Sequence, residues 1–145
     1  MTVMDQSRID ALLHFYETLT PARVTDFGFY YAEDAYFKDP FNEVNRIEDI
    51  REIFARMFRK VMDPRFVISE RVGDADGLFL VWNMNFRMKS CKPQKRLVIR
   101  GVSHLRMRDD GKVTYHRDYW DTGEELYAKL PLIGGAVRFL RRAVS

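Results

Sequence analysis

The chain has 145 residues, enough for one domain of common size, and 46% of them are hydrophobic, enough for a substantial core. The 24 basic and 21 acidic residues are mixed along the chain and leave a net charge of only +3, which does not indicate nucleic-acid binding. The single cysteine excludes an internal disulfide and a cysteine-based metal site and fits a reducing compartment.

No targeting or membrane-spanning segment is expected. Residues 1–6 lack a basic region followed by an apolar run, and no apolar stretch approaches the roughly 20 residues that span a bilayer. We therefore expect one cytoplasmic domain over residues 1–145.

Apolar residues recur at helical spacing in the N-terminal half. The predicted helices cover residues 3–19, 21–31 and 47–61. Asp63-Pro64 is expected to end the third helix. Tyr16 is carried inward by the apolar stripe of the first helix, where its hydroxyl either bonds backbone in the core or belongs to a site.

Later in the chain the hydrophobic period changes from 3.6 to 2. The predicted strands cover residues 35–38, 65–72, 78–89, 94–108 and 112–120. One face of the longest apolar strand carries Leu78, Leu80, Trp82, Met84, Phe86 and Met88. Helices followed by hairpin-connected strands predict an α+β fold, with helices packed on one side of a curved antiparallel sheet.

Two short helices are expected at the C-terminal end, over residues 124–130 and about 132–142. The second is basic and amphipathic. A short helix with few basic residues has little affinity for a membrane surface. We therefore favour packing across a cavity mouth or against a partner, with an anionic membrane as the less favoured alternative.

Asp39 is the first candidate catalytic residue. Pro40 holds it in an extended conformation, and Phe37 and Phe41 flank it. A carboxylate among apolar groups loses hydration, which disfavours its charged form and makes it a usable base. The alternative is that Asp39 only caps a turn.

His116, Asp118 and Trp120 form a second constellation on one face of the last strand. The imidazole and the carboxylate are close enough to influence each other or to bracket a water or a substrate atom. If this face meets solvent, the residues are surface charges; if it faces a cavity with Asp39, they form a site. The three histidines lack metal-ligand spacing, and no phosphate-binding glycine loop is present, so we expect no metal or cofactor.

The stretch YAEDAYFKDPF at residues 31–41, followed by IREIF at 50–54, resembles the nuclear-transport-factor-2-like superfamily. The hairpin DGKV at 110–113, with Tyr119-Trp120, resembles its SnoaL-like members. The superfamily includes ketosteroid isomerase, SnoaL-like polyketide cyclases, scytalone dehydratase and limonene epoxide hydrolase. The resemblance implies a cone-like curved sheet (a cystatin-like roll) around an apolar pocket, and a homodimer through the outer face of the sheet.

The resemblance to ketosteroid isomerase also implies residue roles. Asp39 falls at the position of the general base and Tyr16 at the oxyanion-hole tyrosine. Ser103 stands where that enzyme has a protonated aspartate as second donor. Tyr31 matches a supporting tyrosine, whose usual tyrosine partner is replaced by Phe54.

The same resemblance implies that the His116, Asp118 and Trp120 face points into the pocket with Asp39. The proposed ligand-binding residues are Ser103, Trp120, Trp82, Phe86, Phe54, Met57 and Tyr31. We expect a small apolar ligand or substrate and no nucleic-acid partner.

Three functions follow. The first is acid–base chemistry of the isomerase, cyclase or dehydratase type on an apolar carbonyl compound, with Asp39, Tyr16, His116 and Asp118 as catalytic residues. The second is water activation, as in an epoxide hydrolase. The third is a non-catalytic ligand-binding or dimerisation module.

Overall fold

A six-stranded sheet with strand order β2-β1-β6-β5-β4-β3 forms the frame of the molecule. The computed structural model describes residues 3–89, 95–125 and 131–145. The strands are β1 (Tyr31–Lys38), β2 (Glu43–Val44), β3 (Val61–Asp74), β4 (Gly77–Met88), β5 (Arg96–Met107) and β6 (Val113–Tyr119). The neighbours are antiparallel except β1 and β6, which run parallel.

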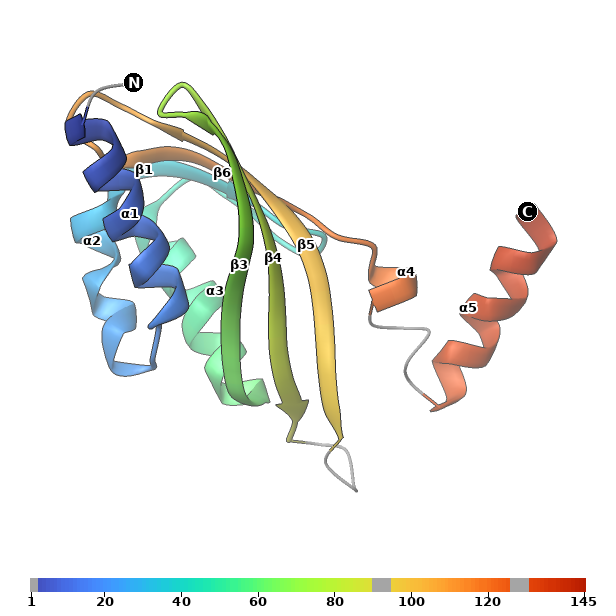
Figure 1. The fold of residues 1–145 in the computed structure, drawn as a ribbon. Helices are drawn as coiled ribbons and strands as arrows, with labels where there is room; N and C mark the ends of the chain where they lie inside the picture. Colours follow the sequence, from blue (N-terminus) through green and yellow to red (C-terminus); the bar gives the residue numbers. More distant parts are fainter. Residues whose placement is uncertain (1–2, 90–94, 126–130) are drawn as a thin grey trace.

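The sheet curls strongly around the N-terminal helices, which lie on its concave side (Figure 1). These are α1 (Val3–Glu17), the 3₁₀ helix η1 (Ala22–Asp26), α2 (Phe27–Tyr30) and α3 (Ile47–Lys60). After the sheet come α4 (Thr122–Glu125) and α5 (Pro131–Val144), which lie on the other side of it in Figure 1. Helix α3 packs against β1 and β3, and α1 packs against β3. The α+β expectation is confirmed. No helix among the described residues is long and apolar enough to cross a bilayer.

The core lies between the concave face and the helices. Ile9, Leu12 and Phe15 of α1 meet residues of the sheet such as Leu78 and Leu105, all almost fully buried. Burying a large apolar side chain contributes roughly 1.5–3 kcal/mol. The inward face predicted for residues 78–88 therefore anchors β4 in the core.

Two predicted boundaries are wrong. The second helix does not reach residue 31, because Tyr31 is already extended and pairs with Val113 of β6. Asp63-Pro64 does not end α3, which stops at Lys60. Asp63 instead has φ of 49°, and the register of β3 shifts between Met62 and Arg65. Proline lacks the N–H that a strand ladder needs, so this pair forms an irregularity inside β3.

At the C-terminal end, the helix expected over residues 124–130 has its described part in α4, and residues 126–130 lie outside the described chain. The expected tail helix is α5. Its position away from the sheet is visible in Figure 1.

Candidate functional site

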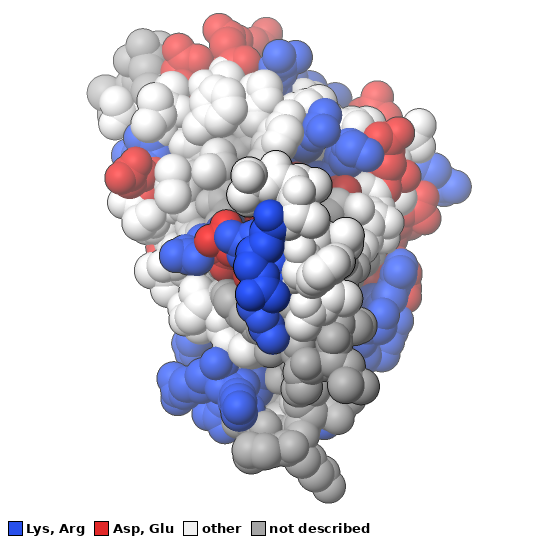
Figure 2. Space-filling view, turned by 90° about the vertical axis from the view of Figure 1, so that its right-hand side faces the viewer, with Lys and Arg blue, Asp and Glu red and all other residues white. Residues whose placement is uncertain are grey.

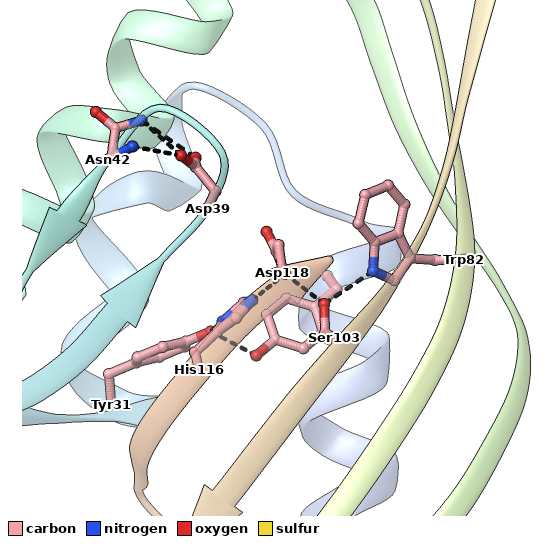
Figure 3. A network of polar contacts seen from close by, with 8 residues as sticks. Tyr31, Asp39, Asn42, Trp82, Ser103, His116 and Asp118 are labelled. Carbon is pink, nitrogen blue, oxygen red and sulfur yellow. Dashed lines mark hydrogen bonds and ion pairs between the residues drawn. The ribbon is translucent and has the colours of Figure 1, made fainter. Parts of the chain in front are cut away.

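A continuous row of buried hydrogen bonds crosses the inner face of the sheet (Figure 3). Trp82 Nε1 lies 2.8 Å from Ser103 Oγ, which lies 2.5 Å from Asp118 Oδ1. The same carboxylate oxygen lies 2.6 Å from His116 Nε2. Beyond the imidazole, Nδ1 lies 2.6 Å from the Tyr31 hydroxyl, which lies 2.5 Å from the Tyr16 hydroxyl. We call these six residues the polar row.

The donor and acceptor roles in the first half of the polar row follow from chemistry. An indole N–H only donates, so Ser103 accepts from Trp82 and donates its own hydroxyl proton to Asp118. An ionised carboxylate only accepts, so Nε2 of His116 carries a proton. Figure 3 shows the second carboxylate oxygen of Asp118 directed away from both donors.

The tyrosine half of the polar row can run in either direction. With a neutral imidazole, Nδ1 accepts from Tyr31, which accepts from Tyr16. With an imidazolium, His116 donates to Tyr31, Tyr31 donates to Tyr16, and the Tyr16 hydroxyl is left to donate elsewhere. The protonation state of His116 therefore decides which way the Tyr16 proton points.

Burial keeps both phenols protonated. Loss of hydration raises the pKa of Tyr16 far above its usual value, and the bond from Tyr31 only partly offsets this. Burial likewise raises the pKa of Tyr31 well above 10. Both side chains therefore remain hydrogen-bond donors throughout the physiological pH range.

Strand register brings the polar row together. Ser103 of β5 pairs directly with Asp118 of β6, and His116 pairs with Phe37 of β1 across the parallel ladder. His116 and Asp118 are two residues apart on one face, so their side chains point the same way. Tyr31 begins β1, where the chain leaves α2, and reaches His116 from the neighbouring strand.

Gly101 lets Trp82 reach Ser103. Gly101 of β5 is the direct cross-strand partner of Trp82 of β4. A Cβ on Gly101 would lie 2.6 Å from two indole carbons of Trp82, closer than real carbon contacts. Glycine therefore lets the indole lie across β5, with its Nε1 directed to Ser103.

Two cavities that share lining residues border this row. The outer cavity has a volume of about 350 Å³. It is lined by Phe37, Asp39, Phe41, Asn42, Ile53, Phe54, Arg56, Met57, Lys60, Phe66, Trp82, Met84, Ile99, Asp118 and Trp120. Its walls are mostly apolar, which is typical of small-molecule sites.

The inner chamber is a smaller space of about 40 Å³ next to Tyr16, Ser103 and His116. This is enough for one water or one small functional group. Four residues line both spaces: Phe54, Phe66, Trp82 and Asp118. Asp118 therefore borders both spaces.

Asp39 lines the outer cavity but is not part of the polar row. Its carboxylate accepts bonds from the backbone N–H groups of Phe41 and Asn42, at 2.8 and 2.7 Å, and from the Asn42 amide at 3.0 and 3.1 Å. Figure 3 shows this pair apart from the row. The geometry matches the turn-capping alternative, and a catalytic role for Asp39 stays a prediction.

The structure brings most of the expected site residues together. Tyr16, Ser103, His116 and Asp118 surround the inner chamber, while Trp82, Trp120, Phe54 and Met57 line the outer cavity. Two expected ligand-binding residues do not line these spaces: Phe86 is buried in the core, and Tyr31 is buried behind His116.

The sequence analysis missed several wall residues. Phe66, Met84 and Ile99 are cross-strand neighbours on β3, β4 and β5 that form one wall of the outer cavity. The inward face predicted for β4 already contained Met84. Its partners could not be assigned without the register.

No group of three or more histidine, cysteine, aspartate or glutamate side chains within the described ranges could hold a metal ion. The acid–base groups of the polar row are a carboxylate, an imidazole and two phenols, and Asp39 adds a second carboxylate to the outer cavity.

Comparison with known proteins identifies the fold. A family model described as a SnoaL-like domain matches residues 12–116. No curated protein sequence matches the chain. Among solved structures, a hypothetical protein with a ketosteroid isomerase-like fold from Catenulispora acidiphila, in complex with trimethylamine, aligns with a TM-score of 0.71 at 17% identity, over 86% of this chain and 93% of that one.

A protein from Shewanella denitrificans that is assigned as a SnoaL-like polyketide cyclase aligns with a TM-score of 0.69 at 17% identity, covering 88% of this chain and 100% of that chain. A protein from Shewanella putrefaciens with the same assignment aligns with a TM-score of 0.68 at 17% identity, covering 87% of this chain and 98% of that chain. At these identities the likeness is one of fold.

Proposed function

The chain belongs to the SnoaL-like domain family, and from its polar row we propose that it is an enzyme performing acid–base chemistry on a small, apolar, carbonyl-bearing substrate. This fold hosts isomerases, cyclases and binding modules, so the family alone does not assign a reaction. The observation that carries the proposal is the hydrogen-bonded His116–Asp118 pair, in which the Asp118 side chain lines both the outer cavity and the inner chamber.

Asp118 is the proposed base. One of its oxygens is held by Ser103 and His116, and the other is directed away from both, as Figure 3 shows. Its side chain is only 16% exposed, so a substrate proton would be transferred where little water competes. A positioned general base typically contributes 10²–10⁴-fold to rate.

Tyr16 is the proposed donor to the carbonyl oxygen. It lines the inner chamber, and its raised pKa keeps it protonated. When His116 is an imidazolium, the Tyr16 hydroxyl points its proton toward the chamber. A single positioned donor of this kind typically contributes 10²–10³-fold.

The proton balance closes over one cycle. Asp118 takes a proton from the carbon next to the carbonyl. Tyr16 gives its proton to the carbonyl oxygen, Tyr31 replaces that proton, and Nδ1 of His116 replaces the one on Tyr31. The enol then coexists with a neutral imidazole and a protonated Asp118. Return of the Asp118 proton to a different carbon, with reversal of the relay, gives the isomer and restores the enzyme.

The substrate class follows from the cavity. Its walls are apolar side chains of α3 and strands β3–β5. Arg56 and Lys60, one turn apart on α3, are exposed and also line this cavity. We expect an apolar body that reaches Asp118, with preference for an anionic group at the cavity mouth.

Water activation is the second candidate, because the inner chamber has the size of one water and is lined by His116 and Asp118. In that reaction the pair would remove a proton from water, and the product would contain solvent oxygen. Turnover in ¹⁸O-labelled water separates the two reactions.

The test uses β,γ-unsaturated cyclic ketones as probes. NMR in D₂O measures the exchange of the protons next to their carbonyl group, and a second assay measures their conversion to conjugated enones. We expect Asp118→Asn to lower the rate 10²–10⁴-fold and Tyr16→Phe to lower it 10²–10³-fold. Asp34→Asn, an exposed change on β1, is the control.

Asp39→Asn decides between the two aspartates that line the cavity. If Asp39 is the base, Asp39→Asn will lose proton exchange and Asp118→Asn will retain it. That result would show that the assignment of Asp118 as the base is wrong. If the wild-type protein binds such ketones but exchanges no protons, a binding module is the better description.

A further inference from the structure

The C-terminal helix α5 has two chemically distinct faces. At 100° per residue, Phe139, Leu140 and Val144 lie on one side of its 14 residues, opposite the side that carries Arg141 and Arg142. No acidic residue occurs between positions 131 and 144. Such separation of apolar and basic residues is typical of helices that lie in the plane of a membrane interface.

The apolar side chains that the structure describes on α5 are open to solvent. Phe139 is 64% exposed, Leu140 61% and Val144 85%. Figure 1 shows the helix standing away from the sheet and from the other helices. Of the described residues that line the outer cavity, none belongs to α5. The described part of α5 therefore does not line the outer cavity, whose mouth was one of the two positions that the sequence analysis favoured; packing against a partner stays a prediction.

The basic face gathers positive charge at one place. Arg138, Arg141, Arg142 and Ser145 surround a single surface hollow of about 310 Å³. Figure 2, which views the side of the molecule where α5 lies, shows basic side chains with uncharged surface on one side and a few acidic side chains on the other. Exposed apolar surface next to grouped arginines is what an interface of lipid tails and anionic headgroups would complement.

We propose that α5 docks this protein on an anionic membrane surface, lying flat with Phe139, Leu140 and Val144 among the acyl chains and the arginines at the headgroups. A helix of this length extends about 21 Å, too short to span a bilayer but sufficient to lie on one. Pairing with α5 of a second copy through the apolar face would fit less well, because it would leave the arginines on the opposite side without a complementary surface.

The test is co-sedimentation of the full chain with vesicles of phosphatidylcholine alone, or of phosphatidylcholine mixed with phosphatidylglycerol. We expect binding to the mixed vesicles that weakens as salt increases. Arg141→Gln with Arg142→Gln should weaken binding roughly 25-fold, since each basic residue contributes about fivefold near an anionic surface. Phe139→Ser with Leu140→Ser should weaken it by more than about 100-fold.

The matched controls remove exposed charges and exposed apolar side chains outside α5. Lys95→Gln with Arg96→Gln removes two exposed charges where β5 begins, and Phe29→Ser with Val72→Ser removes two exposed apolar side chains. Both pairs should bind like the wild type. Circular dichroism checks that each variant is folded; the α5 changes are at exposed positions and should leave the folded body intact.

Three results would overturn the proposal. The first is equal binding to vesicles with and without phosphatidylglycerol. The second is equal loss of binding in the control pairs. The third is no vesicle binding together with a dimer, seen by analytical ultracentrifugation, that Phe139→Ser with Leu140→Ser dissociates; a second copy would then cover α5. None of these results depends on the proposed chemistry.

Discussion

At the scale of single residues, Tyr31 lies in the middle of the relay although it does not line either cavity. It is 1% exposed and bonds both Tyr16 and His116. We expect Tyr31→Phe to lower kcat about as much as Tyr16→Phe while leaving KM nearly unchanged, because it interrupts proton return without altering the cavity wall.

The separate effects on kcat and KM distinguish this positioning role from a purely structural one. Without Tyr31, Tyr16 is no longer linked to His116, so kcat should fall while KM stays nearly unchanged. Reduced stability with an unchanged kcat would show that Tyr31 only supports the core. Loss of its two hydrogen bonds should also lower the free energy of unfolding by about 1–3 kcal/mol.

The buried phenols also predict a loss of stability at high pH. Burial raises the pKa of Tyr16 and Tyr31 above 10.0, their ordinary value. Above pH 10 the unfolded chain therefore releases these protons while the folded chain retains them, so stability falls as pH rises. Each tyrosine contributes a slope of about 1.4 kcal/mol per pH unit.

Urea unfolding between pH 9 and 11 measures this slope. The free energy of unfolding should begin to decline at about pH 10. Tyr16→Phe should decline less steeply than the wild type. Tyr115→Phe, a half-buried tyrosine on β6 for comparison, should decline as the wild type does. Parallel curves for all three proteins would contradict the role of burial.

At the scale of secondary-structure elements, the match between Gly101 and Trp82 supports the polar row. We expect Gly101→Ala to push the indole away, because the new Cβ would lie 2.6 Å from its ring. Ser103 would lose its N–H donor and Asp118 would be held less firmly. The free energy of unfolding should fall by about 1–3 kcal/mol, as for other overpacked sites.

Gly77→Ala is the matched control for this change. Gly77 begins β4, and a Cβ there meets nothing within 4 Å. Urea unfolding and the exchange assay should show little effect. A similar loss in both variants would attribute the effect of Gly101→Ala to strand propensity and not to the indole.

The sequence revealed the elements better than their contacts. The alternation from Leu78 to Met88 predicted the inward face of β4, and the spacing of His116 and Asp118 predicted a shared face. The bond between His116 and Tyr31 joins residues 85 positions apart, and depends on the parallel pairing of β1 with β6. Local periodicity cannot specify such a pairing.

At Asp39 the local sequence was sufficient to predict the contacts of the side chain, which are those of a turn. The turn sequence Asp39-Pro40-Phe41-Asn42 was visible, and aspartate in such turns commonly accepts backbone N–H bonds. Flanking aromatic residues favoured a desolvated base only as long as Phe41 was assumed to be buried. It is 56% exposed and packs on Trp120.

At the scale of the whole molecule, the outer face of the sheet carries a row of aromatic side chains across four strands. Phe79 stacks on His104, which meets Tyr115, which stacks on Tyr36. Phe79 is 42% exposed. The resemblance implies a homodimer through this face, and that expectation stays a prediction.

Phe79→Glu should therefore shift the protein toward monomer, because it places a charge within the aromatic row of the proposed contact face. Analytical ultracentrifugation measures the shift. Phe29→Glu is the comparison, since Phe29 is 77% exposed on α2, on the helical side of the sheet. A monomeric wild-type protein, or dissociation by Phe29→Glu alone, would contradict the prediction.

The walls of the outer cavity have an optical consequence. The chain contains two tryptophans, Trp82 and Trp120, and both line that cavity. All tryptophan fluorescence of the protein therefore originates beside the proposed substrate, and binding can be titrated without a label. In Trp120→Phe the remaining emission comes from an indole bonded to Ser103, so its wavelength would report directly on the hydrogen bonding of the polar row.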